Sequence, residues 1–293
     1  MLLDVVLGYD CNLKCTYCTI TDAMRARRLN PGSVGKEIRA AAQRGVRRVA
    51  FTGGEPTIFP ELPALVRFAK QCGYEEIKVG SNGLRYADPA YLDHLVAAGV
   101  TRFHVSMHGI DDAHYERTVQ RAGTAALRRR AIANLVARGL QPVADLILKR
   151  DTYPDLGRWI ADLRAQGVQR FQLWLVSLTD ANAGAVDQLP RITELVETLC
   201  ACFDAARAGG YSVVSLHVPR CFLPGYEDHV LHPGAEGVRV ITPDDRFDLS
   251  ASRLTGGVKP ASSCGRCRYR AECPGLRQDY VEQYGTGELS PVG

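Results

Sequence analysis

The chain has 293 residues, of which 46% are hydrophobic and 23% are charged. This length and apolar share suffice for one large domain or two smaller ones, and they exclude a disordered chain or a small disulfide-held module. The net charge of +4 is too small to indicate a nucleic-acid partner. No apolar run reaches the ~20 residues of a membrane-spanning helix, and the first residues lack the basic start of a signal peptide. We therefore expect a cytoplasmic protein with no membrane partner.

Apolar runs rich in β-branched residues alternate with segments of helical periodicity. The runs predict strands over residues 2–7, 46–51, 77–80, 102–106, 143–148, 171–176 and 212–218. The periodic segments predict helices over residues 34–43, 62–72, 89–98, 125–138, 156–165 and 192–208. This alternation is typical of an α/β fold with a parallel sheet and helices outside. Six or so such units form a partial or complete βα barrel, with its chemistry at the carboxyl ends of the strands.

The pattern changes after residue 210. Turn-forming pairs such as Pro224-Gly225, Pro233-Gly234 and Pro274-Gly275 become frequent, and no clear helix precedes residues 278–283. We therefore predict two domains, a barrel over residues 1–210 and a small, loop-rich extension over residues 211–293. Because the extension is poor in periodic apolar residues, we expect bound metal to order it.

The chain contains ten cysteines, and without an export signal such thiols are more often metal ligands than disulfides. Cys11, Cys15 and Cys18 follow the first predicted strand, so that three thiols can face one centre. A closed zinc site needs four protein ligands, and no nearby His or Cys supplies the fourth. Three cysteines suit an iron–sulfur cluster that keeps one iron open to another ligand.

The segment Cys11-x3-Cys15-x2-Cys18 resembles the signature of the radical S-adenosylmethionine (radical SAM) superfamily. Further segments at successive strand ends resemble the motifs of that family: Gly53-Gly54-Glu55-Pro56, Ser81-Asn82-Gly83 and Ser106-Met107-His108-Gly109. The resemblance implies a partial (βα)6-type barrel with a 4Fe–4S cluster on the three cysteines. It also implies that the cluster passes one electron to S-adenosylmethionine (SAM). Cleavage then gives a 5′-deoxyadenosyl radical, which abstracts a hydrogen atom from the substrate.

The same resemblance indicates which residues contact SAM. The backbone of Gly53 and Gly54 can approach a ligand closely because these residues have no side chain. The family places the methionine part of SAM there, beside Glu55. Ser81 and Ser106 end adjacent strands and can donate to the carboxylate or the ribose. The predicted cofactor-binding residues are therefore Gly53, Gly54, Glu55, Ser81, Asn82, Ser106 and Lys149.

Three further features have simpler interpretations. Lys149 follows a predicted strand directly. Two interpretations are equally good: its side chain contacts the cofactor or substrate, or it is a solvated loop lysine. His108 lies on the same strand face as Ser106, and we interpret it as a hydrogen-bonded structural histidine. Two arginine clusters, one of Arg25, Arg27 and Arg28 and one of Arg128–Arg130, could hold an anionic group, and we interpret them as solvated helix faces.

The second cysteine group, Cys264-x2-Cys267-x5-Cys273, resembles the auxiliary-cluster extension of the same superfamily, which is called SPASM in its long form and twitch in its short form. The long form has further cysteines in this region. Here no cysteine follows Cys273, and Cys221 is the only upstream candidate, so the extension can hold one auxiliary 4Fe–4S cluster at most. We predict Cys221 as the fourth ligand. An open iron site is one alternative, and a zinc ion on these cysteines is another.

These observations predict a radical SAM enzyme that oxidises or crosslinks a peptide side chain in natural-product biosynthesis. The auxiliary cluster would assist electron transfer or bind the substrate. One alternative is a small-molecule dehydrogenase or rearrangement enzyme, and the first strand at residue 2 favours it by leaving no N-terminal peptide-recognition domain. Another alternative is an iron–sulfur carrier or scaffold without a substrate. For the enzyme we expect an electron donor such as flavodoxin or ferredoxin.

Overall fold

The computed structural model describes residues 1–231 and 237–293, so the predicted turn at Pro233-Gly234 lies outside the described residues. Within these residues the chain forms one nine-stranded sheet with the order β7-β6-β5-β4-β3-β2-β1-β8-β9. Neighbouring strands are parallel except β8 and β9. The strands are β1 (Leu2–Val6), β2 (Arg48–Thr52), β3 (Glu76–Ser81), β4 (Arg102–Met107), β5 (Val143–Leu148), β6 (Arg170–Leu175), β7 (Ser212–Ser215), β8 (Val238–Ile241) and β9 (Arg246–Asp248).

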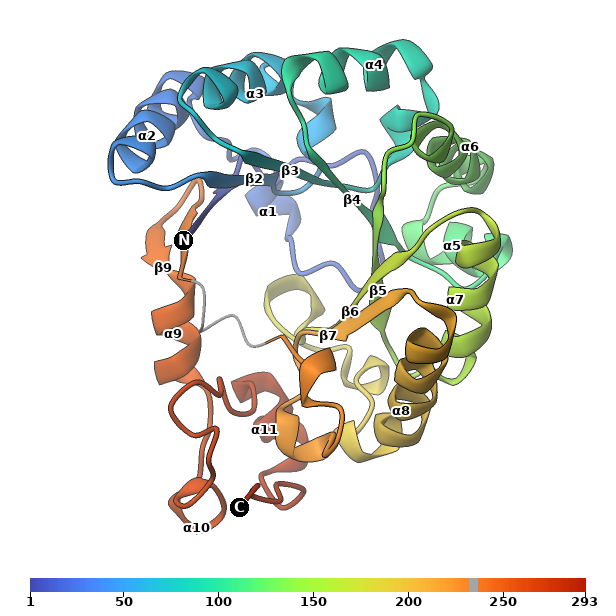
Figure 1. The fold of residues 1–293 in the computed structure, drawn as a ribbon, viewed down its shortest axis with the longest axis vertical. Coiled ribbons are helices and arrows are strands. Elements are labelled where there is room, and N and C mark those ends of the chain that lie inside the picture. The colour runs from blue at the N-terminus through green and yellow to red at the C-terminus, as the bar shows by residue number, and fades with distance from the viewer. Residues whose placement is uncertain (232–236) are drawn as a thin grey trace.

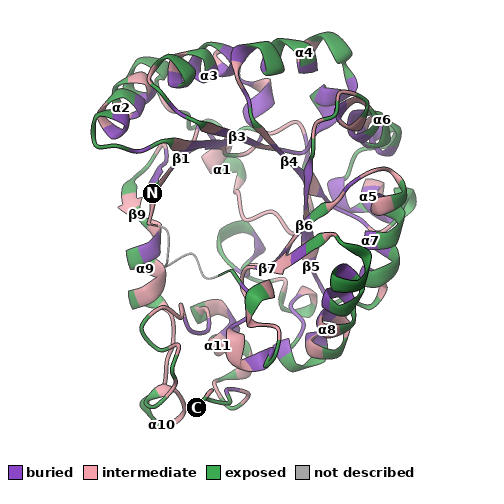
Figure 2. Ribbon diagram, in the orientation of Figure 1, coloured by how far each residue is buried: buried purple, intermediate pink, exposed green. Residues whose placement is uncertain are grey.

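Helices lie outside the curved sheet, which buries its strands between them and the interior (Figures 1 and 2). The helix α2 begins where Asn30 caps it, because Asn30 Oδ1 accepts from the backbone N–H groups of Gly32 and Ser33. No described helix has the length and apolar character needed to cross a membrane. The helices that follow β1 to β6 are α2 (Pro31–Gln43), α3 (Leu62–Gln71), α4 (Pro89–Ala98), α6 (Thr124–Ala137), α7 (Leu156–Ala165) and α8 (Ile192–Gly209).

The predicted partial βα barrel is confirmed, and each predicted strand and helix is present within a few residues of its expected bounds. Two short helices in the connections were not predicted, α1 (Asp22–Arg25) and α5 (Asp112–Val119). The parallel register brings the strand ends to one edge, because Val6 pairs with Thr52 and Ser81 pairs with Val105. The loops that carry the predicted site therefore meet at that edge.

The segment after residue 210 contributes strands to both sides of this sheet. β7 pairs with β6, and β8 pairs with β1. The helices α9 (Leu249–Gly256) and α10 (Ala261–Cys264) also precede residue 278, so the expectation of no helix before that point is wrong. The four residues of β8 show little periodicity of their own, and pairing with β1 stabilises them as a strand. The domain boundary at residue 210 stays a prediction, although the sheet continues across it.

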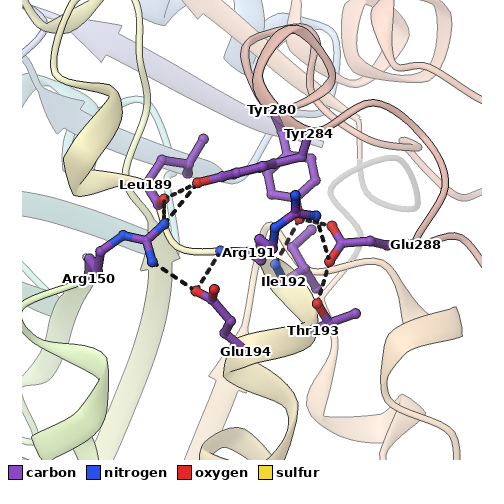
Figure 3. A network of polar contacts seen from close by, with 9 residues as sticks. All are labelled: Arg150, Leu189, Arg191, Ile192, Thr193, Glu194, Tyr280, Tyr284 and Glu288. Carbon is purple, nitrogen blue, oxygen red and sulfur yellow. Dashed lines mark hydrogen bonds and ion pairs between the residues drawn. The ribbon is translucent and has the colours of Figure 1, made fainter.

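The C-terminal helix α11 (Gln278–Tyr284) is held against the start of α8 by a polar network (Figure 3). Tyr280 Oη accepts from the backbone N–H of Ile192 at 2.8 Å and donates to Glu288. Tyr284 Oη donates to the carbonyl of Leu189 at 2.6 Å. The extension therefore docks on the barrel through the hydroxyl groups of a buried tyrosine, Tyr280, and a partly buried one, Tyr284.

Candidate functional site

The first cysteine loop runs directly from β1 across the carboxyl edge of the sheet. Cys11, Cys15 and Cys18 all border one cavity of about 370 Å³ at this edge. Burial raises the pKa of the Cys11 thiol to about 11, and it also raises the pKa of Cys15. Since a thiol must lose its proton to bind a metal, binding of a cation by these partly buried thiols releases protons.

Arginine side chains hold the cysteine loop by its backbone. Arg25 donates to the carbonyl groups of Cys11 and Leu13, each at 3.2 Å. Arg121 donates to the carbonyl of Asn12 at 3.0 Å. The Arg25 side chain is only 17% exposed, so its interpretation as part of a solvated face is wrong. The backbone carbonyl groups of the cysteine loop therefore point toward Arg25 and Arg121, while its three cysteines border the cavity.

Gly53 and Gly54 border the same cavity, but the closest atoms around them belong to the chain itself. A Cβ on Gly53 would lie 2.4 Å from Gly8 O, and one on Gly54 would lie 2.2 Å from Asp10 O. Gly53 also has a φ of +138°, a backbone conformation that residues with side chains rarely adopt. The two glycines therefore allow the end of β2 to pack against the cysteine loop.

The carboxylate of Glu55 is fully buried and accepts hydrogen bonds from neighbouring groups of the chain. It accepts from Ser81 Oγ at 2.7 Å, from the backbone N–H of Asn82 at 2.7 Å and from the backbone N–H of Thr57 at 3.0 Å. Burial raises its pKa, and these donors oppose that shift. Glu55 does not border the cavity, and its predicted contact with SAM stays a prediction.

Ser81, Asn82 and Ser106 border the cavity, as their positions at strand ends predict. Asn82 Nδ2 donates to Asn12 Oδ1 at 2.7 Å and lies 4.0 Å from Cys11 Sγ. The cavity thus combines soft thiol donors on one loop with hydroxyl and amide groups on the neighbouring strand ends. This donor set fits a three-cysteine iron–sulfur cluster with a polar cofactor beside it.

Lys149 and His108 lie near the thiols in different ways. Lys149 is buried, its Nζ pairs with Asp151 Oδ1 at 2.9 Å, and it does not border the cavity. His108 does border it, and its Nδ1 contacts Tyr17 Oη and lies 3.9 Å from Cys15 Sγ. Burial lowers the pKa of His108 to about 4, so the ring is neutral. Its Nε2 has no partner among the described residues, which the interpretation as a satisfied structural histidine does not explain.

Polar side chains inside the barrel strands also border the cavity, and the sequence analysis missed them. Asp4, Lys78, Asp145 and Trp174 come from β1, β3, β5 and β6. Trp174 Nε1 donates to Asp145 Oδ1 at 3.3 Å. A signal was available, since Asp4, Lys78 and Asp145 each interrupt an otherwise apolar strand. In a barrel such residues turn inward, toward the site.

The second group of thiols converges on a separate cavity in the extension. Cys264, Cys267 and Cys273 border it, and Cys221, which is distant in sequence, joins them. Burial raises the pKa of Cys221 to about 11, and the nearby thiols add to the shift. In the described chain no three His, Cys, Asp or Glu side chains are placed to hold a single metal ion. The four cysteines predicted as ligands of the auxiliary cluster nevertheless border the same cavity.

Comparison with known sequences links the barrel half of the chain to one family. The model of the radical SAM superfamily matches residues 5–151. A probable GTP 3′,8-cyclase of Methanopyrus kandleri is 32% identical over 164 residues, which are 54% of this chain and 52% of that protein. The GTP 3′,8-cyclase of Chlorobaculum tepidum is 36% identical over 113 residues, 38% of this chain and 34% of that protein. The chain thus spans about half or less of these relatives.

Solved structures share the fold over the full length of the chain. Streptococcus suis SuiB bound to S-adenosylmethionine has a TM-score of 0.74 and 12% identity, covering 100% of this chain and 76% of that one. The structure of native anSMEcpe with bound AdoMet and Kp18Cys peptide has a TM-score of 0.70 and 14% identity, covering 99% and 93%. With the cysteine loop, the strand-end motifs and the matched family model, these findings establish that the chain belongs to the radical SAM superfamily.

Proposed function

We propose that this protein uses reductively cleaved SAM to abstract a hydrogen atom from its substrate. The observation that carries the proposal is the cavity at the strand ends, where the three thiols of the cysteine loop face Ser81, Asn82 and Ser106. When bound, a 4Fe–4S cluster and SAM supply the electron and the radical. The chain's part is to hold the cluster through Cys11, Cys15 and Cys18, to orient SAM with polar groups at the strand ends, and to exclude water.

Release of 5′-deoxyadenosine tests this proposal. Anaerobically reconstituted protein with SAM and a strong reductant should release it slowly even without substrate, because electron delivery does not need the target. Cys15→Ala should abolish the release by removing a ligand. Cys72→Ala, which removes a thiol at the end of α3, should keep it. No release from wild type under any reducing condition would favour the iron–sulfur carrier or scaffold. In the cell we infer flavodoxin or ferredoxin as the donor.

We further infer that Cys221, Cys264, Cys267 and Cys273 hold a second 4Fe–4S cluster. The four thiols border one cavity, which supports a common site for them, and a zinc ion on the same cysteines is the alternative. The reconstituted protein should contain about eight irons, since each cluster holds four. The variant with Cys11, Cys15 and Cys18 all changed to Ala should keep about four. One zinc with about four irons in the native protein would contradict the second cluster.

For the substrate, we propose a peptide side chain that is oxidised or crosslinked. Fold similarity across the whole chain supports it, since one SuiB structure is bound to the precursor peptide SuiA and one anSMEcpe structure to the Kp18Cys peptide. A small-molecule substrate is the second candidate, because the sequence relatives are named GTP 3′,8-cyclases. Deoxyadenosine release should rise with a peptide encoded beside the gene, with a mass change in that peptide. A rise with GTP and not with the peptide would favour the second candidate.

A further inference from the structure

Arg253, on helix α9, is an arginine that the described chain leaves without a partner. Within residues 1–231 and 237–293 its guanidinium group has no hydrogen bond and no ion pair at contact distance. The side chain is partly buried, and burial together with the charge of Arg277 lowers its pKa, while the charge of Asp4 opposes that shift. Cations removed from water are normally paired, because an unpaired charge carries a large desolvation cost. This unpaired arginine indicates that an anion completes its surroundings.

A second unsatisfied group faces the same space. Arg253 and His217 both border a cavity of about 280 Å³, and His217 Nε2 is buried there without a partner. Nδ1 of His217 lies 3.2 Å from the guanidinium of Arg277, which can only donate, and 3.2 Å from the carbonyl oxygen of Leu175, which can only accept. The Leu175 carbonyl already accepts a hydrogen bond from Arg277 Nη1 at 2.8 Å. We assign Nδ1 as the acceptor, which leaves the Nε2 proton free to donate. Arg277 itself is satisfied by the carbonyl groups of Leu175 and Val176 and by Asp279.

This cavity lies between the two groups of thiols. Gly275 borders both this cavity and the one around Cys221, Cys264, Cys267 and Cys273. On the other side, the ring of His217 meets the edge of Trp174, which borders the cavity of the first cysteine loop, with 5.3 Å between ring centroids. The cavity is formed by elements that are far apart in sequence, because His217 follows β7 and Arg253 lies on α9. Figure 1 shows α9 at the β8–β9 side of the sheet.

We propose that Arg253 and His217 hold an oxyanion of the substrate, either a carboxylate or a phosphate group. The planar fork of a guanidinium group matches both anions, and the Nε2–H of a neutral histidine adds a donor. Held there, the substrate would lie beside the cavity of the first cysteine loop. The assignment rests on the proposed function, because it takes the bound anion to be part of the radical reaction's substrate.

Calorimetric titration of the reconstituted enzyme with inorganic pyrophosphate and, separately, with glutarate tests the proposal. At least one anion should bind the wild type, and Arg253→Gln should bind it at least about tenfold more weakly, because charge-assisted hydrogen bonds are lost. Arg253→Lys keeps the positive charge but lacks the planar guanidinium fork, so its affinity for the anion should lie between those of wild type and Arg253→Gln. Arg246→Gln, an exposed arginine of β9 paired with Glu37, is the matched control and should bind like wild type. The preferred anion distinguishes a phosphate-bearing substrate from a carboxylate-bearing one.

Thermal unfolding gives an independent readout. Without added anion, Arg253→Gln should unfold at the same or a higher temperature than wild type, because the variant removes an unpaired, partly buried charge. The preferred anion should raise the unfolding temperature of wild type and not that of Arg253→Gln. Binding of neither anion by wild type, or equal binding by Arg253→Gln, overturns the proposal. A lower unfolding temperature for anion-free Arg253→Gln also overturns it, since Asp4 would then serve as the partner. These measurements need no SAM cleavage, so their failure is separate from absent deoxyadenosine release.

Discussion

Ser81 Oγ donates to Glu55 Oε1 at 2.7 Å and so joins the ends of two adjacent strands. Glu55 follows β2, and Ser81 is the last residue of β3. The backbone N–H groups of Asn82 and Thr57 donate to the same carboxylate. One buried carboxylate therefore fixes both strand ends next to the cavity of the first cysteine loop.

The first prediction follows from this arrangement. Glu55→Gln should lower the free energy of unfolding by about 2–3 kcal/mol, because the amide NH2 group cannot accept from the buried donors. Glu75→Gln, on an exposed position, is the control and should have no such effect. Chemical denaturation of both variants measures the difference. Unchanged stability of Glu55→Gln together with weaker SAM binding would instead assign Glu55 to the cofactor.

The second prediction concerns Gly54. Gly54→Ala places a Cβ against the carbonyl oxygens of Asp10 and Tyr9, which belong to rigid backbone. The cysteine loop must then shift, at a cost of about 1–3 kcal/mol in stability, and the iron content after reconstitution should fall. Gly157→Ala is the matched control, because a Cβ there meets nothing within 4 Å. At the second residue of helix α7 that change should not destabilise the protein. Full iron content in Gly54→Ala would contradict the packing role of the glycine.

The third prediction tests Cys221 as the fourth auxiliary ligand. With Cys11, Cys15 and Cys18 changed to Ala, electron paramagnetic resonance reports only the cluster of the extension. In that background Cys221→Ala should change the spectrum and the reduction potential, because ligand identity sets both. Cys200→Ala, on helix α8, should change neither. An unchanged spectrum in Cys221→Ala would mean that a ligand other than this cysteine holds the fourth iron.

The fourth prediction is a pH dependence of stability from His217. Burial and the charge of Arg277 lower the pKa of His217 to about 3, against about 6.5 in the unfolded chain. As the pH falls from about 7.5 to about 6, the imidazole of His217 becomes protonated in the unfolded chain and stays neutral in the folded chain. The free energy of unfolding therefore falls. His217→Gln should reduce this loss by at most about 0.8 kcal/mol. Denaturation in phosphate-free buffer measures it, with the exposed His94→Gln as control. Equal pH dependence in wild type and His217→Gln would contradict a neutral buried ring.

Features that depend on local order along the chain could be predicted from the amino-acid sequence. Alternating apolar runs and helical segments determine a βα barrel because each run must bury its side chains between helices and interior. The spacing of Cys11, Cys15 and Cys18 places three thiols on one loop, whatever the rest of the chain does. The strand-end positions of Ser81, Asn82 and Ser106 follow from the same alternation.

The contacts of residues that are distant in sequence became known from the folded structure. In the folded structure the carboxylate of Glu55 accepts a hydrogen bond from Ser81 at the end of the next strand. Cys221 lies beside the thiols of the extension, and β8 pairs with β1. The fold also places Arg253 beside His217, where the described residues offer the guanidinium no hydrogen bond and no ion pair at contact distance. The physical reason is that burial and hydrogen-bond partners depend on which segments meet in space. Periodicity records only which face of a segment is apolar, and it does not record what that face or its polar neighbours will contact.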